Sequence, residues 1–186
     1  MTKANWTANQ PTNMNYLSPV NFDLQITKLP KVKYFCTGVT LPGVTFSEVE
    51  HNTTLSVSSY LPGDKINFDP LVVKFLVDED MKNYMEIFNW IQALGPGLDT
   101  TDYVNLTDSK STPTGRFASE DSLKIYSDAT VFANTSSNNT NVEFNFVDCF
   151  PTSLGSIEFN SQADGVEYAT CDLTLRYTLF TVKTST

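Results

Sequence analysis

The sequence predicts a mainly β fold: an antiparallel β-sandwich or partly open barrel with one amphipathic helix packed on it. Many short segments alternate apolar and polar residues, which is the period of a strand with one buried face. Turn signals rich in Pro, Gly, Asn and Asp separate these segments. One segment changes to an apolar period of three to four residues, which indicates a helix. Short antiparallel strands with a single helix are typical of sandwiches and open barrels.

The most informative stretch is residues 68–95, where a strand runs directly into the predicted helix. Residues 71–77 alternate, so that one face of this strand is entirely apolar. A helix that follows a strand so closely is expected to lie back across a sheet. The apolar face of the strand consists of Leu71, Val73, Phe75 and Val77.

The predicted helix covers residues 80–94. The acidic run at residues 78–80 lies at its start, where carboxylates can accept free backbone N–H groups. Gly95 and Pro96 end it. We expect the helix to cover one sheet on its outer side. Its core contacts are expected to come from Tyr84, Phe88, Trp90 and Ile91.

The N-terminal part is predicted to hold an extended arm and four strands. Residues 1–20 are polar and lack the apolar segment of a signal peptide, so we expect an extended arm there. Residues 21–186 are long enough for a single domain. Turn signals occur at Pro42-Gly43 and Pro62-Gly63-Asp64. The four strands are expected at residues 21–27, 32–41, 44–49 and 53–60.

The C-terminal part is predicted to hold a long loop and further strands. Residues 95–121 are rich in Gly, Thr, Ser, Asp and Pro, and a loop of that length usually has a role. Phe150-Pro151 marks a corner, and the Asn-rich residues 134–141 a hairpin tip. Strands or short strand pairs are expected at residues 123–132, 142–147, 154–159 and 167–182.

The charge balance excludes several classes of function. The chain has 12 basic and 21 acidic residues, a formal net charge of -9. Most of its surface therefore repels nucleic acid and anionic lipid. The nearest approach to a basic cluster is Lys28, Lys31 and Lys33. No apolar run approaches the roughly 20 residues that span a bilayer, so no membrane association is expected.

The sequence gives no positive support for catalysis, a cofactor or a metal. The acidic run at residues 78–80 has two interpretations. It could form a metal site or an acid–base pair, but the start of a helix explains it better. His51 is the one histidine, without a second ligand. Cys36, Cys149 and Cys171 lie in apolar segments and form no CxxC pair, so we expect buried free thiols. An enzyme built on carboxylates from distant strands stays open as an alternative.

Two strand faces are polar but carry few charges. These faces, in residues 53–60 and 167–182, are rich in Thr and Ser. Such a face is either ordinary solvated strand or the wall of an assembly, where both charge clashes and sticky apolar surface are avoided.

The order of these signals resembles the tail-tube proteins of contractile-tailed bacteriophages. The resemblance runs from about Asn21 to Val182, and its specificity comes from the order and spacing of weak motifs. The first motifs are an Asn-Phe strand start, an aromatic strand ending in Pro-Gly, and a Gly-Asp turn. The later ones are an acidic strand end, a helix with Tyr and Trp, an aromatic-Pro corner and an alternating last strand. The matching residues are Asn21, Phe22, Leu24, Ile26, residues 34–43, Pro62, Gly63, Asp64, residues 71–80, Tyr84, Trp90, Phe150, Pro151, Leu154 and residues 173–177.

The resemblance implies the tail-tube fold and a structural role in the virion. Members of that family form six-fold rings that stack around a lumen, and DNA passes through it at ejection. The chain is thus expected to be a hexameric tube subunit inside a contractile sheath, assembled in the host cytoplasm. Its partners would be copies of itself, sheath, and baseplate or terminator proteins. The alternatives are a tube-like baseplate hub or tube initiator, a tail terminator, or an unrelated small β-rich binding module.

The same resemblance suggests which residues face the lumen and the next ring. A hydroxyl-lined, net acidic wall would let DNA slide without sticking. Contacts to the next ring are expected within residues 43–67 or 95–121. The candidate lumen residues are Thr54, Ser56, Ser58, Thr170, Asp172 and Thr174. The candidate ring-stacking residues are Pro62, Gly63, Asp64, Asp99 and Asp102.

Overall fold

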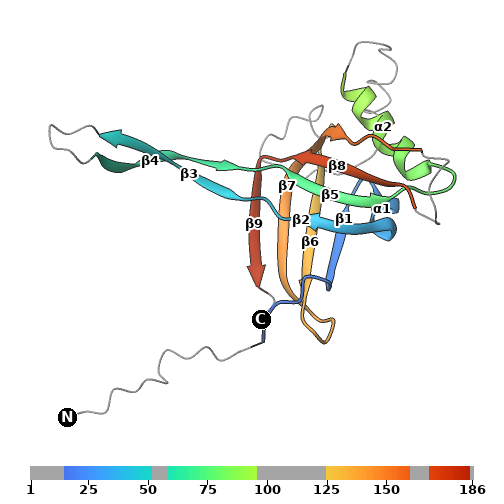
Figure 1. Ribbon diagram of the computed structural model, residues 1–186, viewed down its shortest axis with the longest axis horizontal. Coiled ribbons are helices and arrows are strands. Elements are labelled where there is room, and N and C mark those ends of the chain that lie inside the picture. The colour runs from blue at the N-terminus through green and yellow to red at the C-terminus, as the bar shows by residue number, and fades with distance from the viewer. Residues whose placement is uncertain (1–14, 52–57, 96–124, 160–167, 185–186) are drawn as a thin grey trace.

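The computed structural model describes residues 15–51, 58–95, 125–159 and 168–184, and it confirms the mainly β prediction (Figure 1). Seven strands form one continuous antiparallel sheet. This sheet folds into a first layer (β1, β6, β7, β9) and a second layer (β7, β8, β5, β2). The strands are β1 Phe22–Ile26, β2 Cys36–Thr40, β3 Val44–His51, β4 Ser59–Phe68, β5 Leu71–Leu76, β6 Ser127–Asn134, β7 Thr140–Leu154, β8 Thr170–Arg176 and β9 Leu179–Thr184.

The strand β7 belongs to both layers. Its first half pairs with β6 and β9, and its last residues pair with β8. The change of partners falls at Asp148, whose φ of 58° lies in the left-handed region that L-residues rarely adopt. Bends of this kind let one strand turn a corner between packed sheets. The corner predicted at Phe150-Pro151 thus begins two residues earlier.

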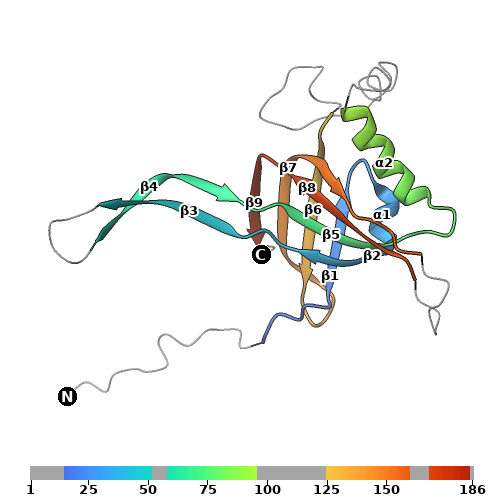
Figure 2. The same ribbon diagram turned by 45° about the horizontal axis from the view of Figure 1, so that its top comes forward.

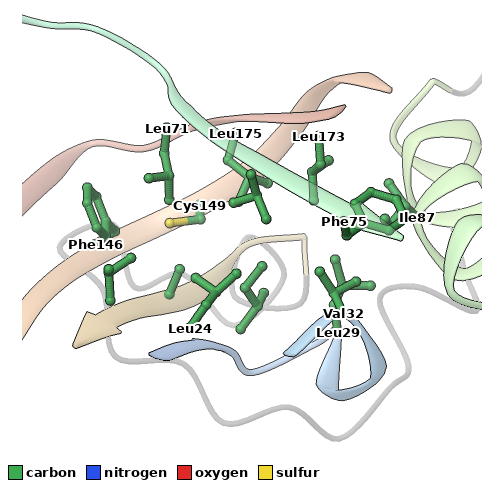
Figure 3. Packing of buried hydrophobic residues seen from close by; sticks show 14 of the residues in the cluster. Leu24, Leu29, Val32, Leu71, Phe75, Ile87, Phe146, Cys149, Leu173 and Leu175 are labelled. Atoms are coloured by element: carbon green, nitrogen blue, oxygen red, sulfur yellow. The ribbon is translucent and has the colours of Figure 1, made fainter. Parts of the chain in front are cut away.

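The hydrophobic core lies between the two layers (Figure 3). The predicted inward face of β5 is confirmed, because Leu71, Val73 and Phe75 are fully buried. The alternation predicted for the last strand is confirmed for β8, where Leu173 and Leu175 are also fully buried. Each layer therefore contributes every second residue of its strands. The first layer supplies Leu24, Ile26, Ala129, Val131 and Phe146.

The predicted helix is confirmed as α2, Lys82–Leu94, which packs against β7 and ends at Gly95. Its start differs from the prediction, because no carboxylate caps it. Asn83 performs this task instead. Its buried amide donates to the Leu76 carbonyl (2.8 Å), and its oxygen accepts from the backbone N–H groups of Tyr84 (2.8 Å) and Asp78 (3.2 Å). One side chain therefore fixes the passage from β5 to α2.

The core contacts of α2 also differ in part from the prediction. Trp90 is buried, and its indole N–H donates to the carbonyl of Ile125 (3.1 Å). Tyr84 and Ile91 are half-buried against the core. Phe88 is 44% exposed, and the fully buried apolar position on this helix belongs to Ile87, which lies beside Phe75 (Figure 3).

The strand predicted at residues 32–41 is wrong in its first half. Residues Pro30–Phe35 form the short helix α1, and β2 follows directly. Pro30 occupies the first turn, where its fixed φ suits a helix and its missing N–H is not needed. Val32 is fully buried by the core, while its neighbours Lys31 and Lys33 point outward. One apolar residue between two polar ones is the pattern of a strand start, and it is also the pattern of a short helical turn that buries one residue.

The turn predicted at Pro62-Gly63-Asp64 is also wrong, because these residues lie inside β4. Phe46 pairs with Ile66 and Glu48 pairs with Pro62, so three residues of β4 lie opposite Ser47 alone. The result is a bulge. The Ser47 hydroxyl accepts from the Lys65 N–H (3.0 Å). A Cβ at Gly63 would lie 2.7 Å from the Ser47 carbonyl oxygen, so a glycine is needed there.

The last predicted strand, residues 167–182, consists of two strands in different layers. β8 ends at Arg176, and β9 starts at Leu179. Between them, the N–H of Thr178 donates to the Val147 carbonyl (3.0 Å), and the Tyr177 hydroxyl donates to the Asp69 carbonyl (2.8 Å). The predicted loop at residues 95–121, apart from Gly95, and the extended arm, apart from residues 15–20, lie outside the described residues.

Candidate assembly surfaces

The clearest candidate surface is a two-stranded hairpin formed by β3 and β4, which leaves the layered body on one side (Figures 1 and 2). We call it the projecting hairpin. Large apolar side chains on it are more than half exposed. An isolated hairpin of two strands is marginal in water, and single apolar residues on a surface are common, but a row of them is not. The exposed members are Val44, Phe46, Val49, Tyr60, Leu61 and Ile66.

The two faces of the projecting hairpin differ along its length. Residues that pair directly across an antiparallel ladder share a face. Near the body, one face carries Val44, Phe46, Ile66 and Phe68. Beyond the bulge, the same face carries two acidic residues, because Glu48 pairs with Pro62 and Glu50 pairs with Tyr60. The sequence could not reveal this surface. The alternation of apolar and polar residues predicts that one face of a strand is buried, but it does not indicate whether the same chain or another copy buries it.

A cluster of aromatic side chains fixes the projecting hairpin to the body. Phe68, the last residue of β4, lies 5.3 Å from Phe180 and 6.1 Å from Tyr177, measured between ring centroids. Phe146 completes this group at 4.9 Å from Tyr177. Burial raises the pKa of Tyr177 to about 12, so that its hydroxyl stays a donor to Asp69. The packing of these aromatic side chains therefore sets the direction of the hairpin relative to the body.

Three strands have a free side at the margins of the layers. Within the described residues, β1 pairs with β6 alone, β2 with β5 alone and β9 with β7 alone. The outer N–H and C=O groups of such strands can pair with another chain. β9 also exposes Val182, at 55%. These margins are suited to association with further strands.

The second layer exposes a polar face on β5 and β8. Three of the candidate lumen residues share it: Thr170 and Asp172 are exposed and Thr174 is half-buried. Lys74 lies across from Asp172 at 3.8 Å, and both side chains are more than half exposed. A pair in that setting contributes little to stability. The face also carries the exposed Arg176, so its described charged residues are Lys74, Asp172 and Arg176 beside the two threonines of β8.

Of the remaining lumen candidates, the described one, Ser58, does not join this face within one chain. Ser58 is half-buried beside the start of β4, at the outer end of the projecting hairpin. Thr54, Ser56, Asp99 and Asp102 lie outside the described residues. The ring-stacking candidates Pro62, Gly63 and Asp64 come together in the bulge of β4.

Two carboxylates meet at the bend of β7, a feature that the sequence did not suggest. Asp148 is 8% exposed, and its Oδ2 has no hydrogen-bond partner among the described residues. Its N–H donates to Asp128 Oδ1 at 3.4 Å. Burial raises the pKa of Asp128; the N–H of Asp148 opposes this shift and the charge of Asp148 adds to it. Its own burial raises the pKa of Cys149 to about 12, and the charges of Asp128 and Asp148 act in the same direction, which makes this thiol a poor nucleophile.

The structure gives no indication of metal or redox chemistry in the part of the chain that it describes. The three cysteines are free thiols, as predicted; Cys149 and Cys171 are buried and Cys36 is half-buried. Burial raises the pKa of each. Among the described ranges, no three His, Cys, Asp or Glu side chains are grouped to hold a metal ion. None of the described helices has the length and apolarity to cross a membrane.

The sequence matches the phage tail tube protein family over residues 9–183. A relative, the tail tube terminator protein of Enterobacteria phage T4, is 26% identical over 122 residues. This alignment includes 66% of the present chain and 60% of the T4 protein. The chain thus spans less than two thirds of the length of that relative.

Two solved structures have a similar fold. The tube terminating cap of the anti-feeding prophage aligns with a TM-score of 0.58, at 16% identity, over 98% of this chain and 100% of the cap protein. A chain from the sheath/tube terminator of an extracellular contractile injection system, PVC, aligns with a TM-score of 0.55, at 14% identity, over 92% and 99% of the two chains. At these identities the likeness concerns the fold.

Proposed function

The chain belongs to the phage tail tube protein family, and from its similarity to a tail tube terminator we propose that it is a tube terminator, a ring subunit that closes the end of a contractile tail tube. The family places it in the virion tail. The role is structural and requires no catalytic group. An unrelated β-rich binding module, one of the alternatives from the sequence, is excluded by the family match.

The observation that carries this proposal is the sequence match to the T4 tail tube terminator over 122 residues. The fold adds support, because the cap protein of the anti-feeding prophage aligns over its full length. The corresponding chain of a sheath–tube complex has a lower TM-score of 0.52, at 14% identity over 96% of this chain and 95% of that one. The terminator alternative is therefore better supported than the tube subunit that the sequence first suggested.

The open margins support assembly into a ring. Copies that join edge to edge satisfy the outer backbone groups of β1, β2 and β9 and remove edges that would otherwise aggregate. We propose six copies, as the family resemblance implies. The apolar residues of the projecting hairpin would then be buried between copies, which restores the cover that a lone hairpin lacks.

The polar face of the second layer is proposed to line the lumen. Thr170, Asp172 and Thr174 would face the channel, with Thr54, Ser56 and Ser58 contributed by neighbouring hairpins. Hydroxyl groups and a net acidic chain would keep DNA phosphates from binding during ejection. A ring with these β8 side chains against the core of another copy would contradict this assignment.

The contacts to the rest of the tail are proposed to lie in two places. The bulge at Pro62, Gly63 and Asp64 would meet the last ring of the tube, together with Asp99 and Asp102. The outward side of α2 would face the sheath. Baseplate proteins would be partners only if the chain acts as a tube-like baseplate hub or tube initiator, which is the less supported alternative.

A second candidate is the repeating tube subunit itself, which the family description favours. The two roles differ in one property: a tube subunit stacks on copies of itself, whereas a terminator stacks on a different protein. Electron microscopy and light scattering of the purified chain distinguish them. We expect discrete rings without tubes, and one ring at the end of each tube when the matching tube protein is added. Long tubes from the purified chain alone would contradict the terminator role.

A further inference from the structure

The outer part of the projecting hairpin combines acidic and aromatic side chains on one face. Glu48 and Glu50 are two residues apart in β3, so their side chains point the same way. Pro62 and Tyr60 lie opposite them in β4, and Tyr60 is 62% exposed. We call Glu48, Glu50 and Tyr60 the acidic stripe, which Pro62 of the bulge borders. Tyrosine is enriched at protein interfaces, whose rims are polar.

A surface of matching chemistry lies where α1 meets α2. Val32 is fully buried and fixes α1 on the core, while Tyr34 is 83% exposed. Lys31 pairs with Glu86 of α2, and Lys33 lies 3.3 Å from Asp23. We call the exposed residues of this region the α1–α2 surface: Lys31, Lys33, Tyr34, Lys82 and Met85.

The lysines of the α1–α2 surface can accept a second acidic partner. The side chains of Lys31 and Lys33 are 48% and 40% exposed, and exposed ion pairs stabilise a protein by about 0–1 kcal/mol. A second acidic group can therefore join each pair at little cost. Lys31, Lys33 and Lys82 each lie beside one carboxylate, so these pairs are balanced in charge within a chain of net charge -9.

The two surfaces lie on opposite sides of the molecule. Both views show the projecting hairpin leaving the body on the side away from α1 and α2 (Figures 1 and 2). The hairpin of one chain therefore does not reach its own α1–α2 surface. A contact between two such different surfaces on separate copies is head-to-tail, and repeating it gives a ring when the rotation between copies closes.

We propose that the acidic stripe of one copy docks on the α1–α2 surface of a second copy, with Glu48 and Glu50 beside Lys31 and Lys33 and with Tyr60 near Tyr34. This inference rests on the proposed ring of copies and specifies how neighbouring copies recognise one another. It also gives the apolar base of the hairpin a cover, because docking of the outer part brings the second body against β3 and β4.

Charge reversal tests the contact. One variant carries Glu48→Lys and Glu50→Lys, and the other carries Lys31→Glu and Lys33→Glu. Each alone should weaken ring formation about tenfold or more, measured by mass photometry at low salt. An equimolar mixture of the two should return to within about threefold of the unmodified chain, because every interface then again pairs opposite charges. The matched reversal Glu158→Lys, at an exposed residue outside the proposed contacts, should leave ring formation unchanged.

A photocrosslink gives the second readout. A benzophenone amino acid in place of Tyr60 should link to residues 30–35 or 82–89 of another copy, identified by mass spectrometry of the digested ring. Rings that form but link elsewhere, or variants that mixing does not rescue, would overturn the docking while leaving the ring intact. Absence of rings from the unmodified chain would overturn both. Circular dichroism of each variant checks that it folds.

Discussion

The layered body and the projecting hairpin are built from the same kind of sequence, yet they end in different environments. In β8, alternate residues such as Leu173 are fully buried by the opposite layer. In β3 and β4, alternate residues such as Phe46 and Ile66 remain 54% and 56% exposed. The difference teaches that alternation specifies a face to be covered, whereas the fold decides whether the cover comes from the same chain.

The largest expected effect compares these two regions directly. Leu173→Ala removes a buried side chain between the layers and should lower the free energy of unfolding by about 3–5 kcal/mol. Ile66→Ala in the projecting hairpin should lower it by less than about 1 kcal/mol, because that side chain is already in water. Urea unfolding of the monomer measures both. Equal losses for the two variants would mean that the side chain of Ile66 is as buried as that of Leu173, which would contradict the contrast between an exposed hairpin and a buried core.

A second prediction concerns the turn that joins β5 to α2. Asn83→Ala leaves the Leu76 carbonyl and the N–H groups of Asp78 and Tyr84 without their partner, and should destabilise the protein by about 2–3 kcal/mol. Asn89→Ala, at an exposed position of the same helix, is the matched control and should have almost no effect. Thermal unfolding of both variants distinguishes them. A small loss for Asn83→Ala would show that the acidic residues before α2 can cap it after all.

A third prediction sharpens the contrast from within the body, where one position is strained. Asp148→Gly relieves a left-handed φ and removes a buried carboxylate oxygen that lacks a partner, so it should stabilise the monomer by about 1 kcal/mol. Asn138→Gly is the control, since Asn138 has a similar φ in an exposed turn and asparagine tolerates it. Destabilisation by Asp148→Gly would indicate that the carboxylate holds the bend of β7.

The smallest expected effect is a pH dependence. The pKa of Asp128 is raised in the folded protein mainly by burial. The folded state therefore holds this proton more tightly than the unfolded state does, and the stabilisation is complete below the unfolded pKa of about 4. It is lost as pH rises through the folded pKa. Asp128→Asn should remove this part of the pH dependence in urea unfolding between pH 3 and 7; an unchanged profile would contradict the assignment.

Much of the body was predictable from the sequence, because its periods are long and unambiguous. The alternation in β5 and the helical spacing of α2 both specify an element and its buried face. The β6–β7 hairpin was predicted from its Asn-rich turn, and the turn indeed joins Asn134 to Thr140. In each case a local pattern and the final packing agree.

The sequence failed where tertiary contacts override a local signal. The alternating pattern before β2 is compatible with a strand. In the fold, the same residues form the helix α1, because the core buries Val32 alone. Pro62-Gly63-Asp64 has turn chemistry, but Ser47 on the partner strand accommodates it as a bulge. The break at Tyr177 depends on Asp69, more than a hundred positions away in the chain. The polar alternation predicted for the lumen could not show that Ser58 and Thr174 lie far apart in one subunit.

The passage of β7 through both layers has a mechanical consequence. Two sheets held together by side chains alone can slip past one another under load, whereas here slippage would have to stretch a continuous backbone at Asp148. The subunit should therefore bear sideways force as one rigid block. In the proposed role at the end of a tail tube, such a block would transmit the load to neighbouring subunits without changing its own shape.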